Sequence, residues 1–113
     1  MTAEPTTEAG ALVLVPDIEL DLLTCPEWHC ELIGALKRED CEVLIVDFSQ
    51  VEFFGAIGLE VLVDIRDRAA RCGVDLRLIV CSRPVWRPLE VTGLAVDFPI
   101  YGSRADALTG YQA

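Results

Sequence analysis

Residues 43–48, Val-Leu-Ile-Val-Asp-Phe, form a nearly unbroken apolar run in the first half of the chain. Valine and isoleucine favour extended backbone, so this run predicts a β-strand. A strand with so little polar alternation is buried on both faces, as parallel strands in α/β proteins are. The run therefore favours a layered fold in which helices cover a sheet.

Helical and extended patterns alternate around this run. Extended segments are predicted at residues 11–15, 74–81 and 98–101. Apolar residues at helical spacing predict helices over residues 24–37, 56–72, 84–91 and 103–108. Thr24 and Glu27 have the spacing of a capping box at the start of the first helix, and Pro99 favours an edge position for the last strand. Alternating units of this length predict an α/β sandwich with a mixed or parallel sheet.

The chain of 113 residues is long enough for one domain with a core of its own. Residues 1–9 are polar and contain Pro5, so we predict a mobile tail there and a single domain over residues 10–113. The N-terminus lacks the charge and apolar core of a signal peptide, and no apolar run has the length of a membrane span. We therefore expect a cytoplasmic protein.

The negative charge is concentrated in one half of the chain. The formal net charge is −10, of which residues 1–64 carry −12 and residues 65–113 carry +2. Nucleic acids and anionic lipid surfaces both require a basic footprint on a protein partner. We therefore expect no direct binding to nucleic acid and none to membranes.

Few residues in this chain suit catalysis or metal binding. His29 is the only histidine, and although Cys25 and Cys30 lie near it, their spacing matches no established zinc pattern. A helix with a partly exposed histidine beside a buried cysteine explains the same residues. The chain has no P-loop and no G-x-G-x-x-G or G-x-S-x-G motif. We expect a protein that is not an enzyme and has no cofactor or metal.

The cysteines are odd in number and contain no C-x-x-C motif, which argues against a disulfide framework. Buried cysteines commonly serve as small apolar residues. A redox switch between two of the thiols is the alternative. The candidates for such a switch are Cys25, Cys30, Cys41, Cys72 and Cys81.

The segment between the buried strand and the longest helix is unusual. Two phenylalanines precede a helix start at which Gly55 is the only acceptable cap. Gly58, in the first turn, either lets a partner approach closely or avoids a clash inside the protein. Corners between strand and helix are common binding sites in open α/β sheets. The corner is therefore either a binding surface or a packing feature.

The same segment resembles the signature of STAS domains, the fold of bacterial anti-sigma factor antagonists. Residues 46–59 read V-D-F-S-Q-V-E-F-F-G-A-I-G-L, against the family pattern D-(L/F)-S-x-V-x-(F/Y)-(apolar)-D-S-(S/A)-G-L. Residues 17–21, D-I-E-L-D, stand where the family has G-E-L-D, and residues 89–94, L-E-V-T-G-L, match a motif near its C-terminus. The resemblance implies a STAS-like α/β fold, with a mixed β-sheet of four to five strands and helices packed mainly on one face.

The resemblance also implies a partner-switching protein, monomeric or weakly dimeric, that regulates transcription indirectly. Its partner would be an anti-sigma factor, typically a GHKL-type serine kinase, bound through the start of the long helix. The implied partner-binding residues are Asp21, Glu52, Phe54, Gly55, Ala56, Ile57, Gly58 and Glu60. The family arrangement would gather acidic residues around that helix start, so the charge would act as a docking field that salt weakens.

The chain departs from the family at the regulatory serine. Gly55 falls at the family's aspartate, Ala56 at its phosphoacceptor serine and Ile57 at the next serine. Alanine has no hydroxyl, so we expect no phosphate on residues 48–60.

Three interpretations are then open. The first is an antagonist that stays competent to bind or is controlled by other means, such as its cysteines. The second is an accessory or scaffold subunit of another complex, as in lipid transport or the stressosome. The third is a STAS domain that binds a small ligand or nucleotide.

Overall fold

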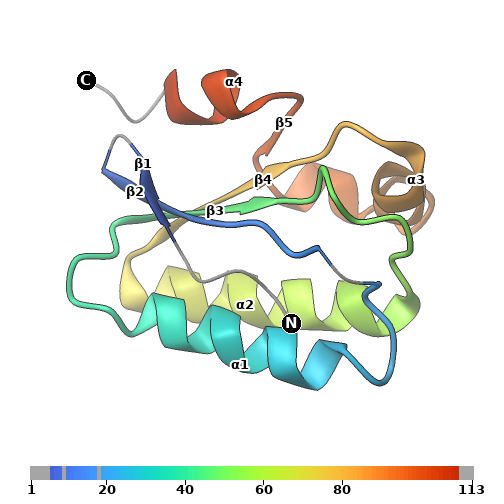
Figure 1. Cartoon of the computed structure of the whole chain (residues 1–113), viewed down its shortest axis with the longest axis horizontal. Coiled ribbons are helices and arrows are strands. Elements are labelled where there is room, and N and C mark those ends of the chain that lie inside the picture. The colour runs from blue at the N-terminus through green and yellow to red at the C-terminus, as the bar shows by residue number, and fades with distance from the viewer. Residues whose placement is uncertain (1–5, 9, 18, 110–113) are drawn as a thin grey trace.

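A five-stranded sheet between two unequal layers of helices forms the fold (Figure 1). The computed structural model describes residues 6–8, 10–17 and 19–109. In chain order the elements are β1 (Thr6–Glu8), β2 (Ala11–Leu14), α1 (Cys25–Leu36), β3 (Val43–Asp47), α2 (Ala56–Cys72), β4 (Asp75–Ile79), α3 (Arg83–Val91), the 3-10 helix η1 (Leu94–Asp97), β5 (Ile100–Tyr101) and α4 (Arg104–Thr109).

The strands lie in the order β1-β2-β3-β4-β5. Strands β2 to β5 run parallel, whereas β1 is antiparallel to β2. The parallel core follows from the helices between the strands, because a parallel pair requires a long crossover connection. Strand β3 is central and its five residues are all buried, as its apolar run predicts. The predicted mixed sheet is confirmed, and β5, which follows Pro99, takes one edge.

The predicted mobile tail is wrong for residues 6–8. These residues form β1, in which Thr7 pairs with Leu12 of β2, and Gly10 lies in the connecting turn with a φ of 89°. An edge strand is held by backbone hydrogen bonds and needs no apolar pattern, so polar residues gave no signal of it. The remainder of the predicted tail, residues 1–5 and 9, lies outside the described residues.

Helices α1, α2 and α3 cover one face of the sheet and α4 covers the other (Figure 1). Alternate residues of each strand point to opposite faces. Leu44 and Val46 of β3 accordingly join the larger core with Trp28, whereas Ile45 joins a smaller core beneath α4. No helix in the described part of the chain combines the length and apolar character needed to cross a membrane.

Arginine side chains hold α4 against the sheet. Arg77 of β4 is buried and donates to the Ala107 carbonyl and to the Asp75 carboxylate. Arg104 donates to the buried carboxylate of Asp47 over 2.8 Å. Burial alone would raise the pKa of Asp47, but the hydrogen bonds from Arg104 and Ser49 outweigh it, so the pKa is lowered. The carboxylate at the end of β3 is therefore charged at neutral pH.

The rings of Trp28, Phe48 and Phe54 pack edge to face beneath the start of α2. Their centroids lie 5.4–6.5 Å apart. A β-carbon added to Gly58 would lie only 2.7 Å from a ring carbon of Phe54. Gly58 is thus required by packing inside the protein, which supports the clash interpretation of this glycine.

Gly58→Ala is expected to lower the free energy of unfolding by about 1–3 kcal/mol, although alanine is the better helix former, because the enclosed Phe54 ring must move. Gly34→Ala in α1 is the matched control, since its added carbon meets nothing within 4 Å. That substitution should raise the free energy of unfolding by about 0.5–1 kcal/mol. Urea unfolding followed by circular dichroism measures both, and equal stabilities would contradict the packing argument.

Candidate functional site

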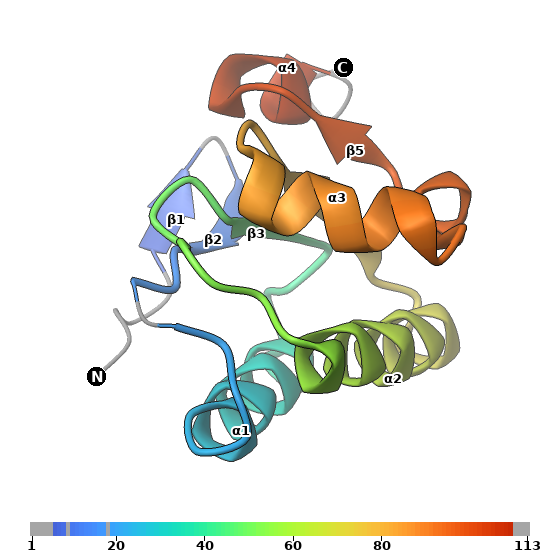
Figure 2. The ribbon, with the colours of Figure 1, turned by 90° about the vertical axis from the view of Figure 1, so that its right-hand side faces the viewer.

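Two segments that are distant in sequence form one surface at the start of α2. The Leu20 amide donates to the Phe53 carbonyl over 2.9 Å, and the Gly55 amide donates to the Leu20 carbonyl over 3.0 Å. Figure 2 shows the segment that enters α1 and the loop that enters α2 descending side by side. These backbone hydrogen bonds fix the two segments relative to each other.

A tight turn precedes α1. One carboxylate oxygen of Asp21 accepts hydrogen bonds from the amides of Leu23 and Thr24, at 2.9 and 3.1 Å. These bonds, first that from Thr24 and then that from Leu23, lower the pKa of Asp21. The predicted capping box of Thr24 and Glu27 is wrong. The Thr24 hydroxyl donates to the Glu19 carbonyl and accepts from the Asp21 amide instead, so it faces away from the helix.

An open groove of about 550 Å³ lies between this turn and α2. We call it the first groove, and its lining residues are Asp21, Leu22, Leu23, Phe53, Gly55, Ala56, Ile57 and Glu60. The side chains of Leu22, Leu23 and Phe53 are 76%, 89% and 50% exposed. Contiguous exposed apolar side chains rimmed by polar residues are typical of interaction surfaces.

The first groove contains most of the residues that the resemblance implied. Asp21, Gly55, Ala56, Ile57 and Glu60 all line it. Phe54 and Gly58 are buried and do not line it. They support the surface from beneath, because the Phe54 ring fills the space left by Gly58. Glu52 lies apart, in an acidic depression with Asp17, Glu19 and Gln50.

Sequence reasoning missed three residues that dominate this surface: Leu22, Leu23 and Phe53. Two adjacent leucines before a helix start, outside any apolar period, were the available signal. For two neighbouring phenylalanines, the sequence has no pattern that shows which one faces the solvent. Which of Phe53 and Phe54 points inward depends on the backbone pairing with Leu20.

The charge near the first groove is negative and uncompensated. Asp21 and Glu60 line the groove, and the depression with Glu52 adds further carboxylates. Within the described ranges no lysine or arginine forms an ion pair with Asp21, Glu52 or Glu60. A partner that covers this surface must therefore supply positive charge or leave carboxylates desolvated.

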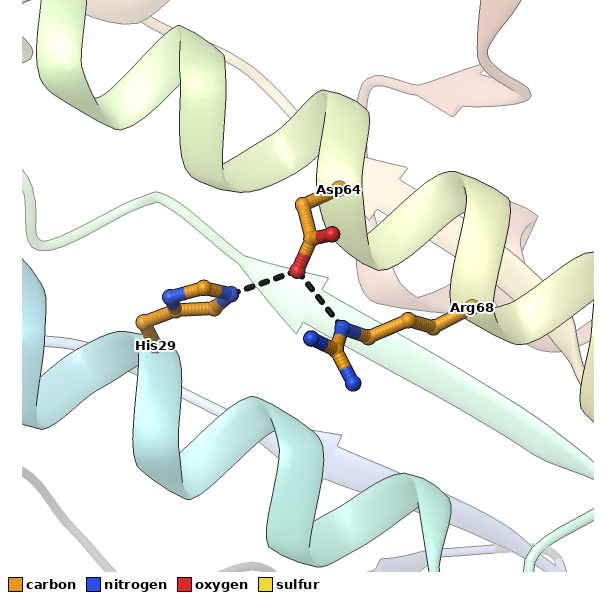
Figure 3. A network of polar contacts seen from close by, with 3 residues as sticks. All are labelled: His29, Asp64 and Arg68. Carbon is orange, nitrogen blue, oxygen red and sulfur yellow. Dashed lines mark hydrogen bonds and ion pairs between the residues drawn. The ribbon is translucent and has the colours of Figure 1, made fainter.

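His29 forms a polar link between α1 and α2 (Figure 3). Its Nε2 lies 2.6 Å from Oδ2 of Asp64, which also accepts a hydrogen bond from Arg68 over 2.7 Å. Arg68 first, and then His29, lower the pKa of Asp64. Over the described residues, no three His, Cys, Asp or Glu side chains are grouped to hold a metal ion. These contacts give His29 a structural role, because they link α1 to α2.

The cysteines fall into two classes. Cys25 and Cys41 are buried, and burial raises the pKa of both thiols. The carboxylates of Asp21 and Asp40 raise them further. Cys30, Cys72 and Cys81 are exposed. Only the exposed thiols are therefore accessible to an oxidant in the folded protein.

Comparison with known proteins agrees with the fold and with the sequence motifs. The family described as STAS domain matches residues 2–107. The chain belongs to the STAS domain family. The resemblance seen in the sequence is thereby confirmed, and the first groove is a feature of a STAS domain.

Two relatives and one solved structure illustrate the similarity. The chain is 31% identical over 101 residues to the anti-sigma-F factor antagonist RsfB of Mycobacterium tuberculosis, covering 89% of this chain and 81% of RsfB. It is 27% identical over 100 residues to an anti-sigma F factor antagonist of Paenibacillus polymyxa, covering 88% and 86%. An anti-sigma factor antagonist from Mycobacterium paratuberculosis has the same fold, with a TM-score of 0.88 and 27% identity over 100% of this chain and 94% of that one.

Thiol labelling should separate the two classes of cysteine. N-ethylmaleimide should modify Cys30, Cys72 and Cys81 in the native protein, because these residues are exposed. Cys25 and Cys41 should react only after unfolding, since they are buried and their raised pKa leaves little thiolate. Mass spectrometry of labelled peptides measures this, with the unfolded protein as control. Rapid labelling of Cys25 in the native protein would contradict its burial, because it would show that the start of α1 opens.

Proposed function

We propose that this STAS protein is an anti-sigma factor antagonist that acts by binding rather than by catalysis. The observation that carries the proposal is the first groove, an exposed apolar surface at the start of α2. The named roles of the relatives at 31% and 27% identity support it. By occupying an anti-sigma factor, the protein would free a sigma factor for transcription.

The groove is suited to binding because its parts are fixed before a partner arrives. The hydrogen bonds of Leu20 join its two segments, and the Asp21 carboxylate holds the turn that exposes Leu22 and Leu23. Little conformational entropy is then lost on association. Burying a fully exposed leucine contributes about 1.5–3 kcal/mol, so these side chains are the expected anchors.

Control by phosphate at this surface would need a hydroxyl that Ala56 lacks. Ala56 is exposed in the first turn of α2 and lines the groove. We place it at the family's phosphoacceptor position. The nearest serine in the loop is Ser49. Its amide donates a hydrogen bond to the Asp47 carboxylate, which gives Ser49 a structural role. We propose that the binding surface is permanently available.

Ala56→Glu should weaken binding to the partner anti-sigma factor by about a hundredfold, because a third carboxylate would be desolvated beside Asp21 and Glu60. The melting temperature should be unchanged or slightly higher, since an acidic residue is favourable in the first turn of a helix. Each anti-sigma factor encoded in the genome of origin, purified and titrated by calorimetry, provides the measurement.

Ala105→Glu is the matched control for this experiment. It makes the same substitution at an exposed position in the first turn of α4, on the opposite side of the sheet. Its affinity should equal that of the wild type. The proposal fails if no anti-sigma factor binds the wild type, or if Ala56→Glu binds as tightly as Ala105→Glu.

Incubation with the bound anti-sigma factor and ATP should leave residues 48–60 without phosphate. Mass spectrometry of the peptide that covers this window provides the readout. Ala56→Ser restores a hydroxyl at the exposed position and tests whether the factor can phosphorylate it. A phosphopeptide from this window of the wild type would contradict permanent availability.

A further inference from the structure

A second apolar groove lies on the other side of α2. It measures about 390 Å³, and its lining residues are Ala56, Leu59, Glu60, Val63, Thr92 and Leu94. We call it the second groove. It runs between α2 and the segment that joins α3 to η1, whereas the first groove lies on the side of α1.

Ala56 and Glu60 separate the two grooves and line both of them. They are one helical turn apart, so they form a ridge along the exposed side of α2. Ile57 lies on the side of the first groove, and Leu59 and Val63 lie on the side of the second. Any partner large enough to cover the ridge therefore meets both grooves.

Half of the large exposed apolar residues line the first groove. In the described part of the chain the large ones are Leu22, Leu23, Phe53, Trp86, Val91 and Val96. The first three line the first groove. Val91 and Val96, 69% and 87% exposed, are close in sequence to Thr92 and Leu94 of the second groove but do not line it. Trp86 lies elsewhere, in a depression at the start of α3.

Glu60 on the ridge is exposed, and no described lysine or arginine forms an ion pair with it. A partner that fills both grooves removes water from this carboxylate. Such burial is favourable only when an opposite charge is supplied in good geometry. The ridge therefore selects a partner with a cation at the centre of its contact.

We propose, on the basis of the function proposed above, that the partner straddles α2. It seats one apolar side chain in each groove and pairs a lysine or arginine with Glu60 between them. A helix with its side chains is about 10 Å across, so the two apolar groups are about 10 Å apart. Positions i and i+7 of a partner helix have this separation, and a cation at i+3 or i+4 falls between them on the same face.

A second copy of this chain does not fit the surface. A symmetric contact would bring the ridge of one copy against the ridge of the other, with Glu60 near Glu60. Each copy also carries a net charge of −10, which opposes association. The charge complementarity thus points to a basic protein partner.

Charge reversal on the ridge and a carboxylate inside the second groove test the proposal. Glu60→Arg should weaken binding to the anti-sigma factor by about a hundredfold, since the new arginine repels the partner's cation. It should also reduce the loss of affinity caused by added salt. Val63→Glu should weaken binding by about tenfold, because Val63 lines the second groove and the substitution places a carboxylate in it. Titration calorimetry measures the affinities.

Glu39→Arg is the matched control for the charge reversal, because Glu39 is exposed and lies after the end of α1, whereas the first groove lies at the start of that helix. Its affinity should stay within about twofold of the wild type. Replacing the paired lysine or arginine of the anti-sigma factor with glutamate should restore its binding to the Glu60→Arg variant.

The outcomes separate this inference from the proposed function. If Ala56→Glu weakens binding while Glu60→Arg and Val63→Glu bind like the wild type, the straddling contact is wrong and the proposed function stands. If no anti-sigma factor binds the wild type, the proposed function is wrong and the inference falls with it. Thermal melts of each variant distinguish a lost contact from a lost fold.

Discussion

The insertion of the Phe54 ring beneath Gly58 is the contact on which the functional surface depends. It packs the first turn of α2 against the core, where the rings of Trp28 and Phe48 contact Phe54. The neighbouring residue, Phe53, is then turned outward into the first groove. A core contact and a surface contact thus come from two adjacent residues with opposite orientations.

The sheet beneath this corner gives it a rigid base. All residues of β3 are buried, and both neighbours of β3 run parallel to it. The carboxyl end of β3 leads directly into the loop that carries the groove, as expected for binding sites in open α/β sheets. The first groove therefore combines an exposed turn with one of the best-anchored positions in the fold.

The sequence predicted the elements well where apolar periodicity was strong. The helix predicted over residues 56–72 is observed with the same bounds, and β3 differs by one residue at its end. Periodicity fails where backbone pairing alone holds an element, which is why β1 was missed. It fails again at Thr24, since the competing partners of its hydroxyl, Glu19 and Asp21, belong to a turn that has no period.

For the candidate site, residue type and family resemblance located the surface, and the structure assigned the faces. Asp21, Ala56 and Glu60 were predicted and line the first groove. The second groove could not be predicted, because it joins α2 to residues 92–94 across a contact between helices. Segments so far apart in sequence leave no local pattern that links them.

The Asp47 carboxylate connects the loop after β3 with the start of α4. It accepts one hydrogen bond from the Ser49 amide in the loop that leads to the first groove, and another from Arg104 at the start of α4. The last helix and the binding loop therefore share a single anchor, although they lie on opposite sides of the sheet. By thermodynamic linkage, whatever loosens α4 from Asp47 also changes the free energy that holds this loop in place.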